Sequence, residues 1–279
     1  MKARYVNPYT DFGFKKLFGE EANKDLLKDF LNELLPAQHK IVQLNFKNTE
    51  QWGAIAADRK AIFDIHCENT NGEKFIIEMQ KAKIKFFKDR AMFYTTFPIR
   101  EQAEKGEWDF ELNPVYCVAL VDFKYDDNRE NKDFLSNVQL KDQYCQVFSN
   151  KLTYVFIEMP RFTKEEHQLE THFDKWLYFL KHLEDFENIP GILDEEIFAK
   201  AFRVAEVANF TKEQLAQYEE SLKKYRDLKG VVDTSYEEGR IEEKNKIALK
   251  MKKKGESAEK ISEYTGLSIE EIDKLIPTE

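Results

Sequence analysis

The hydrophobic positions of the chain follow mixed periods up to Pro160 and helical periods after it. Apolar residues recur at intervals of three and four between residues 22 and 34, which predicts a helix that Pro36 ends. Runs rich in Ile, Phe and Val predict strands. The predicted strands are residues 41–49, 60–68, 73–80, 114–123 and 152–158. A helix kinked at Pro98 is predicted over residues 86–105. This order of elements predicts a mixed α/β core.

The part of the chain after Pro160 is predicted to consist of helices. The candidate helices are residues 164–185, 194–208, 212–228, 235–254, 257–264 and 269–276. Three pairs have the spacing of capping boxes: Thr163 with Glu166, Thr211 with Gln214, and Ser268 with Glu271. The last two helices and the Thr-Gly-Leu-Ser turn between them resemble a small helix-turn-helix. We therefore divide the chain into a core over residues 1–160, a helical extension over residues 161–230 and a tail over residues 231–279.

The loop between the second and third predicted strands allows two registers. A two-residue loop, Asn71-Gly72, would set Asp64 opposite Met79. A three-residue loop with Gly72 in the left-handed conformation sets Asp64 opposite Glu78. Only the second register places the apolar faces of both strands on one side of the sheet, as a shared core requires. These faces are Ala61, Phe63, Ile65 and Cys67 on one strand and Phe75, Ile77 and Met79 on the other. The sequence therefore predicts the three-residue loop.

The predicted register brings two carboxylates together on the polar side of the hairpin. Asp64 and Glu78 face each other there, and Gln80 follows on the same side. Facing carboxylates repel each other, and a divalent cation between them removes that penalty. Hard oxygen ligands of this kind suit magnesium or manganese. The alternative interpretation is a solvent-facing polar stripe on a half-exposed sheet, and the residues alone leave both open.

Composition and charge narrow the classes of protein. An apolar fraction of 42% predicts a folded chain. The sequence has no run of about 18 apolar residues and no signal-like N-terminus, so no membrane partner is expected. The three cysteines are far apart and odd in number, which favours the reducing cytoplasm. A net charge of -9 argues against non-specific adhesion to nucleic acid. Residues 81–90 nevertheless carry five bases and one acid, which form either a solvated basic face or a phosphate-binding surface.

Several segments together resemble one known family. Asp64 is separated by thirteen residues from Glu78-Met79-Gln80, which is similar to the PD-(D/E)xK nuclease signature, although Gln80 replaces its lysine and no proline precedes Asp64. Other matching segments are the Asp-Phe-Gly-Phe-Lys-Lys-Leu-Phe run at residues 11–18, Arg90 with Tyr94, the Asn-Pro-Val-Tyr run at residues 113–116, and the charged C-terminal helix with its Thr-Gly-Leu-Ser turn. In combination they resemble the recombination-promoting nuclease and putative transposase family of the PD-(D/E)xK superfamily.

This resemblance implies a restriction-endonuclease-like fold, in which helices flank a mixed sheet core and a helical part follows. It also implies a divalent-metal-dependent DNA endonuclease associated with recombination or mobile elements. Asp64 and Glu78 would ligate Mg²⁺ or Mn²⁺, and Gln80 would orient water or phosphate. The residues that would contact nucleic acid are Lys15, Lys81, Lys83 and Arg90. The missing lysine leaves Lys60, Lys81 and Lys83 as alternative sources of positive charge, and Asp11, Glu20 or Glu21 as alternative outer ligands.

The competing class is a binding or interaction protein. A nuclease fold without the motif lysine could hold DNA without cutting it, or act as an accessory factor in transposition. The expected partners are DNA and, through the C-terminal helices, a second copy of the chain. For Arg90 and Tyr94, which share a helix face, core packing and DNA contact both remain open.

Overall fold

The computed structural model describes residues 3–36, 39–51, 61–103, 109–125 and 133–275. The chain divides into two compact units, Met1–Tyr225 and Arg226–Glu279. No helix within the described ranges combines the length and the apolar character that crossing a membrane requires.

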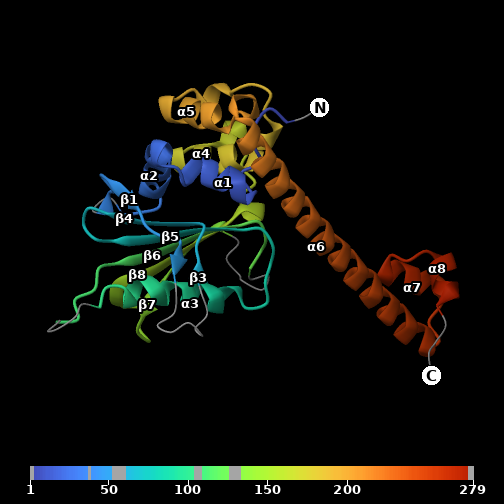
Figure 1. Cartoon of the computed structure of the whole chain (residues 1–279). Coiled ribbons are helices and arrows are strands. Elements are labelled where there is room, and N and C mark those ends of the chain that lie inside the picture. Colours follow the sequence, from blue (N-terminus) through green and yellow to red (C-terminus); the bar gives the residue numbers. More distant parts are fainter. Residues whose placement is uncertain (1–2, 37–38, 52–60, 104–108, 126–132, 276–279) are drawn as a thin grey trace. The chain divides into compact units, whose positions relative to one another are not determined.

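A mixed six-stranded sheet forms the centre of the first unit (Figure 1). In spatial order its strands are β1 (Leu44–Phe46), β4 (Ile65–Asn69), β5 (Lys74–Gln80), β6 (Val115–Val121), β8 (Val147–Glu158) and β7 (Leu135–Lys141). The three strands β5, β6 and β8 run parallel, and the outer pairs are antiparallel. A separate two-stranded ribbon joins β2 (Glu50–Gln51) to β3 (Ala61–Ile62). Strand β6 is buried along its whole length, as its continuous apolar run predicts.

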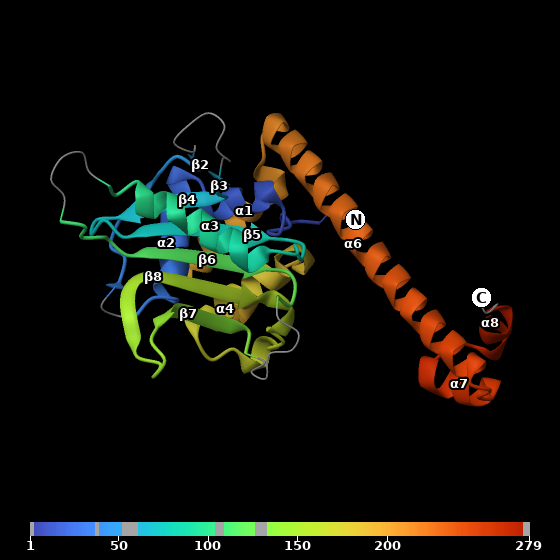
Figure 2. The ribbon, with the colours of Figure 1, turned by 90° about the horizontal axis from the view of Figure 1, so that it is seen from below.

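Helices cover both faces of this sheet (Figures 1 and 2). One face carries α1 (Asp11–Phe18), α2 (Lys24–Asn32), α4 (His172–His182) and α5 (Glu196–Ala205), and α3 (Phe87–Arg100) lies on the other. Trp176 of α4 is fully buried and contacts Phe18 of α1, with ring centroids 5.7 Å apart. Phe87 of α3 contacts Phe156 of β8, with ring centroids 5.5 Å apart, in a cluster that also contains Val121 of β6. Short 3₁₀ helices among the described residues include Glu21–Asn23, Met159–Arg161, Glu166–Gln168, Leu183–Asp185, Gly191–Leu193 and Val207–Asn209. The predicted mixed α/β core with flanking helices is confirmed.

Several predicted elements differ in detail from the structure. Strand β7 was not predicted, because its side chains are mostly exposed and show no clear alternation. It is held as an edge strand by its backbone pairing with β8. A capping box precedes α4 at Thr171 and Asp174, and another lies at Glu165 and Gln168, instead of the predicted pair at Thr163.

The C-terminal helices begin with one long helix where two were predicted. Helix α6 (Lys212–Lys253) continues through Gly230 and runs from the first unit into the second. It is followed by α7 (Ala258–Thr265) and α8 (Ile269–Lys274). Gly266 ends α7 with a φ of 66°, and the predicted capping box of Ser268 and Glu271 begins α8. Apolar side chains of all three helices form a small core, which contains Ala248, Ile261, Leu267 and Ile272.

Candidate metal centre

The hairpin that carries the two carboxylates has the predicted register. Ile65 pairs with Ile77 and Cys67 with Phe75, so the loop is residues 70–72. Gly72 has a φ of 75°, the left-handed conformation that glycine adopts at low cost. A Cβ atom at this position would lie 2.8 Å from the Asn113 side-chain nitrogen. Both the backbone conformation and this close approach favour glycine and fix the register.

Asp64 and Glu78 are neighbours across the hairpin, as predicted. The Met79 N–H donates to Asp64 Oδ2 over 2.7 Å, and the Asp64 N–H donates to Glu78 Oε1 over 3.3 Å. The regular backbone pairing of β4 with β5 ends at Ile65 and Ile77, and beyond it the two carboxylates accept the backbone N–H groups. Each carboxylate is held by the backbone of the opposite strand, which fixes the position of both.

The predicted second strand is interrupted at this point, which corrects two expectations. Residues 63 and 64 separate β3 from β4, and β3 pairs with β2, so the predicted pair of Ile62 with Gln80 does not form. Phe63 was expected to face the same side as Ile65. It packs instead with Ile76 and Phe97 on the face that α3 covers. The bend at Asp64 turns the Phe63 side chain to the opposite face of the sheet. It also leaves the Asp64 backbone N–H outside the strand ladder, where it donates to Glu78 Oε1.

The carboxylates lie where the two helical layers meet. Helix α1 supplies Asp11 and Lys15 from one layer, and α3 supplies Arg90 and Tyr94 from the other. The Arg90 guanidinium lies over the Tyr94 ring, 4.9 Å from its centroid. The charge of Arg90 lowers the pKa of Glu78, against the larger effect of burial.

The start of α1 is fixed by local contacts that position Asp11 and Lys15. The Thr10 hydroxyl accepts a hydrogen bond from the Gly13 N–H over 2.9 Å and caps the helix. A Cβ atom on Gly13 would lie only 2.2 Å from the Asn7 carbonyl oxygen. Lys15 forms an ion pair with Asp11 at 2.9 Å, one turn away along the helix.

Burial and mutual repulsion disfavour the charged forms of both carboxyls. Burial raises the pKa of Glu78 to about 8, and the charge of Asp64 adds to the shift, while Arg90 and Lys15 oppose it. Burial also raises the pKa of Asp64, and Asp11 adds to that rise against Lys15 and Lys81. A cation placed between the two carboxylates would reverse both shifts.

The donor set fits a cation that keeps part of its water shell. Among the residues that the structure describes, no group of three or more His, Cys, Asp or Glu side chains could hold a metal ion. Two carboxylates are available, and Mg²⁺ is commonly bound by one or two carboxylates together with water and substrate phosphates. Asp11 and Glu20, both considered as outer ligands, line the same pocket as Asp64. Glu21 instead forms an ion pair with Lys24.

Gln80 stands where the family motif has a lysine, and several lysines are close to it in sequence. The Gln80 side-chain N–H donates to the Ala82 carbonyl oxygen over 3.0 Å, which leaves the amide oxygen as the end that can bind a metal or water. Lys81 is partly buried; burial lowers its pKa, and Asp11 and Asp64 act in the opposite direction. Lys83 is exposed, and Lys60 lies outside the described residues.

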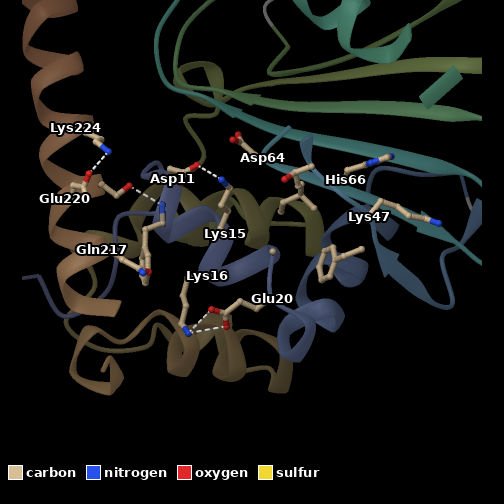
Figure 3. A pocket seen from close by; sticks show the side chains of 16 residues that line it. Asp11, Lys15, Lys16, Glu20, Lys47, Asp64, His66, Gln217, Glu220 and Lys224 are labelled. Carbon is tan, nitrogen blue, oxygen red and sulfur yellow. Dashed lines mark hydrogen bonds and ion pairs between the residues drawn. The ribbon is translucent and has the colours of Figure 1, made fainter. Parts of the chain in front are cut away.

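A pocket of about 700 Å³ opens beside Asp64 (Figure 3). Asp11, Lys15 and Asp64 lie together at one side of it, as the labelled sticks show. The other charged residues that line it are Lys16, Glu20, Lys47, Glu220 and Lys224. Sequence reasoning missed Lys16, Lys47 and Lys224, because each comes from a different segment and no local pattern marks them.

His66 also contributes to the lining but is nearly fully buried. Its Nδ1 lies 3.1 Å from the Asn48 carbonyl oxygen, and its ring meets Phe63 edge-on at 5.5 Å. Burial lowers its pKa. These contacts favour a neutral, structural imidazole.

Comparison with known proteins agrees with this geometry. The family model described as PD-(D/E)XK nuclease family transposase matches residues 8–235, which is more than half of the chain. Neither the search of curated proteins nor that of solved structures found a match. The matched range contains the whole six-stranded sheet, the carboxylate hairpin and the first part of α6. The chain belongs to the PD-(D/E)XK nuclease family transposases.

Proposed function

We propose that this protein is a DNA endonuclease that hydrolyses phosphodiester bonds with Mg²⁺ or Mn²⁺ and takes part in recombination or in the movement of mobile elements. The family suggests a nuclease- or transposase-related function. The observation that carries the finer proposal is the placement of Asp64 and Glu78. Each accepts a hydrogen bond from the backbone across the hairpin, and both are partly or largely buried. The fold therefore holds two carboxylates side by side, although burial and mutual repulsion destabilise their charged forms.

The residues of the chain divide the proposed work between them. Asp64 and Glu78 would hold the cation, which would activate water and stabilise the charge that develops on the phosphate. The Gln80 amide oxygen would orient that water. Lys15 and Lys81 place positive charge beside Asp64, on the side of the α1 layer.

The substrate would approach along positive charge supplied by both layers. Arg90 acts from α3, and the exposed Lys83 extends the same basic segment. Phosphate contacts of this kind release counterions, so DNA binding should weaken as salt rises.

The direct test is cleavage of plasmid and single-stranded DNA by the purified full chain. We expect slow cleavage that requires Mg²⁺ or Mn²⁺ and stops with a chelator. Binding without cleavage in either metal would support the second candidate, a DNA-binding or transposition accessory protein. The observation that favours this candidate is Gln80, which donates to Ala82 and carries no positive charge.

The source of the missing positive charge gives a second prediction. Lys81→Ala should lower the cleavage rate by roughly 10²-fold, the usual effect of losing one group that stabilises transition-state charge. Lys81→Arg should retain most of the rate, and Gln80→Lys should preserve or raise it. Lys83→Ala tests the competing source of charge, because Lys83 lies in the same basic segment but is exposed, and with saturating DNA it should lower the rate much less than Lys81→Ala. The rates would be measured with saturating Mg²⁺, and equal losses for Lys81→Ala and Lys83→Ala would contradict the assignment.

A further inference from the structure

One stretch of α6 is exposed on every side. All residues from 226 to 243 are described, and each of them is exposed, including Leu228, Val231, Val232 and Tyr236. The stretch makes about five helical turns. Together with Ile241, five large apolar side chains therefore face water within a short length of helix.

This stretch is a weak helix former when it is alone. It contains Gly230 and Gly239, and each glycine costs about 1 kcal/mol relative to alanine within a helix. Val231 and Val232 add two β-branched residues with lower helix propensity. Isolated helices of this length are marginal in water, and most helical stability in proteins comes from packing an apolar face. A packing partner for the stretch is therefore expected.

The apolar residues define the face that such a partner would cover. Leu228, Val232 and Tyr236 follow one another at intervals of four, so they line one side of the helix, and Val231 lies beside them. Their exposed fractions are 42%, 41% and 69% for the first three and 64% for Val231. We call these four residues the α6 stripe.

Charges of opposite sign flank the α6 stripe. Residues 223–229 contain four bases and one acid, and residues 237–243 contain four acids and one base. The bases are Lys223, Lys224, Arg226 and Lys229, and the acids are Glu237, Glu238, Glu242 and Glu243. The two charged segments lie at similar distances from Val232, one on each side.

We propose that the α6 stripe binds the same stripe of a second copy of this chain, with the two helices antiparallel and crossing near Val232. This arrangement sets the basic segment of each copy against the acidic segment of the other, at both ends of the contact. A parallel pairing in register would set acids against acids and bases against bases, which is destabilising. The self-complementary charge pattern identifies a second copy as the occupant. The pairing goes beyond the proposed nuclease activity and does not depend on it.

Cysteine cross-linking tests both the contact and its direction. Cys145 is the exposed native cysteine and Cys67 and Cys117 are buried, so the full-length chain with Cys145→Ser is a suitable background. In that background Val232→Cys should form a disulfide-linked dimer on mild oxidation. Leu228→Cys and Tyr236→Cys should each link poorly alone, but an equal mixture of the two, with tags of different mass, should link to each other. Self-linking of each single variant with no gain in the mixture would show parallel helices and overturn the proposal.

Charge reversal provides an independent measurement in solution. Arg226→Glu with Lys229→Glu, and separately Glu237→Lys with Glu238→Lys, should each weaken dimerisation at least about tenfold, as measured by analytical ultracentrifugation. Mixing the two variants should restore a dimer, because opposite charges then face each other again. Glu263→Lys with Glu270→Lys reverses two exposed charges outside the stretch and should leave the dimer unchanged. A monomeric wild type at high micromolar concentration would overturn the proposal.

Discussion

Asp64→Asn and Glu78→Gln are each expected to abolish metal-dependent DNA cleavage, with losses of about 10³-fold or more. The proposed cation is held by these two carboxylates, and electrostatic stabilisation by a bound metal is worth several kcal/mol in the transition state. Both substitutions keep the size of the side chain. The glutamine side chain of Glu78→Gln retains an oxygen that can accept from the Asp64 N–H, so the hairpin geometry should be preserved.

The matched control for these variants is Glu68→Gln. Glu68 lies on β4, one of the two strands of the hairpin, and its ion pair with Lys74 at 2.8 Å is outside the candidate centre. This variant should cleave DNA at nearly the wild-type rate. Nicking by Asp64→Asn at the wild-type rate, after identical purification, would place the activity at another site or in a contaminant.

The register of the hairpin could be predicted because its signal was local and strict. Phe75, Ile77 and Met79 occupy every second position, with Ile76 as the one apolar residue of the opposite face, and Gly72 marks the loop. The bend at Asp64 could not be predicted, because it depends on a hydrogen bond from Met79 to a side chain and not on hydrophobic alternation. Phe63 therefore moved to the opposite face of the sheet.

The surroundings of the carboxylates could be predicted only in part. The resemblance to the family implied Asp64 and Glu78, but the approach of α1 depends on contacts that are distant in sequence, such as the packing of Phe18 on Trp176. For the same reason Lys15 was predicted only as a nucleic-acid contact, while the structure places it beside both carboxyls. Side chains such as Lys224, which reach the pocket from α6, carried no sequence signal.

Glu78→Gln is also expected to stabilise the metal-free protein, and only at neutral to alkaline pH. Burial, together with Asp64, raises the pKa of Glu78 from 4.5 to about 8. Between these values the folded state holds a proton that the unfolded state releases, so the free energy of unfolding falls as pH rises from about 4.5 to about 8. Below that range Glu78 is protonated in both the folded and the unfolded state, so its ionisation no longer lowers the free energy of unfolding. The glutamine of Glu78→Gln does not titrate, so the variant does not lose stability as the pH rises through this range.

Thermal unfolding in a chelator, measured at pH 5 and at pH 8.5, tests this expectation. The melting temperature of Glu78→Gln should exceed that of the wild type by several degrees at pH 8.5 and by much less at pH 5, because about 1 kcal/mol shifts a unit of this size by roughly 2–4 °C. Adding Mg²⁺ should raise the melting temperature of the wild type but not that of the variant, since the cation offsets the same repulsion. Glu68→Gln should show no gain at pH 8.5, because Lys74 and Lys47 lower the pKa of Glu68 against the effect of burial. It should keep the wild-type response to Mg²⁺, because Asp64 and Glu78 are both present. A melting temperature of Glu78→Gln below that of the wild type at pH 8.5 would mean that the Glu78 carboxylate is stabilised by its neighbours without any metal.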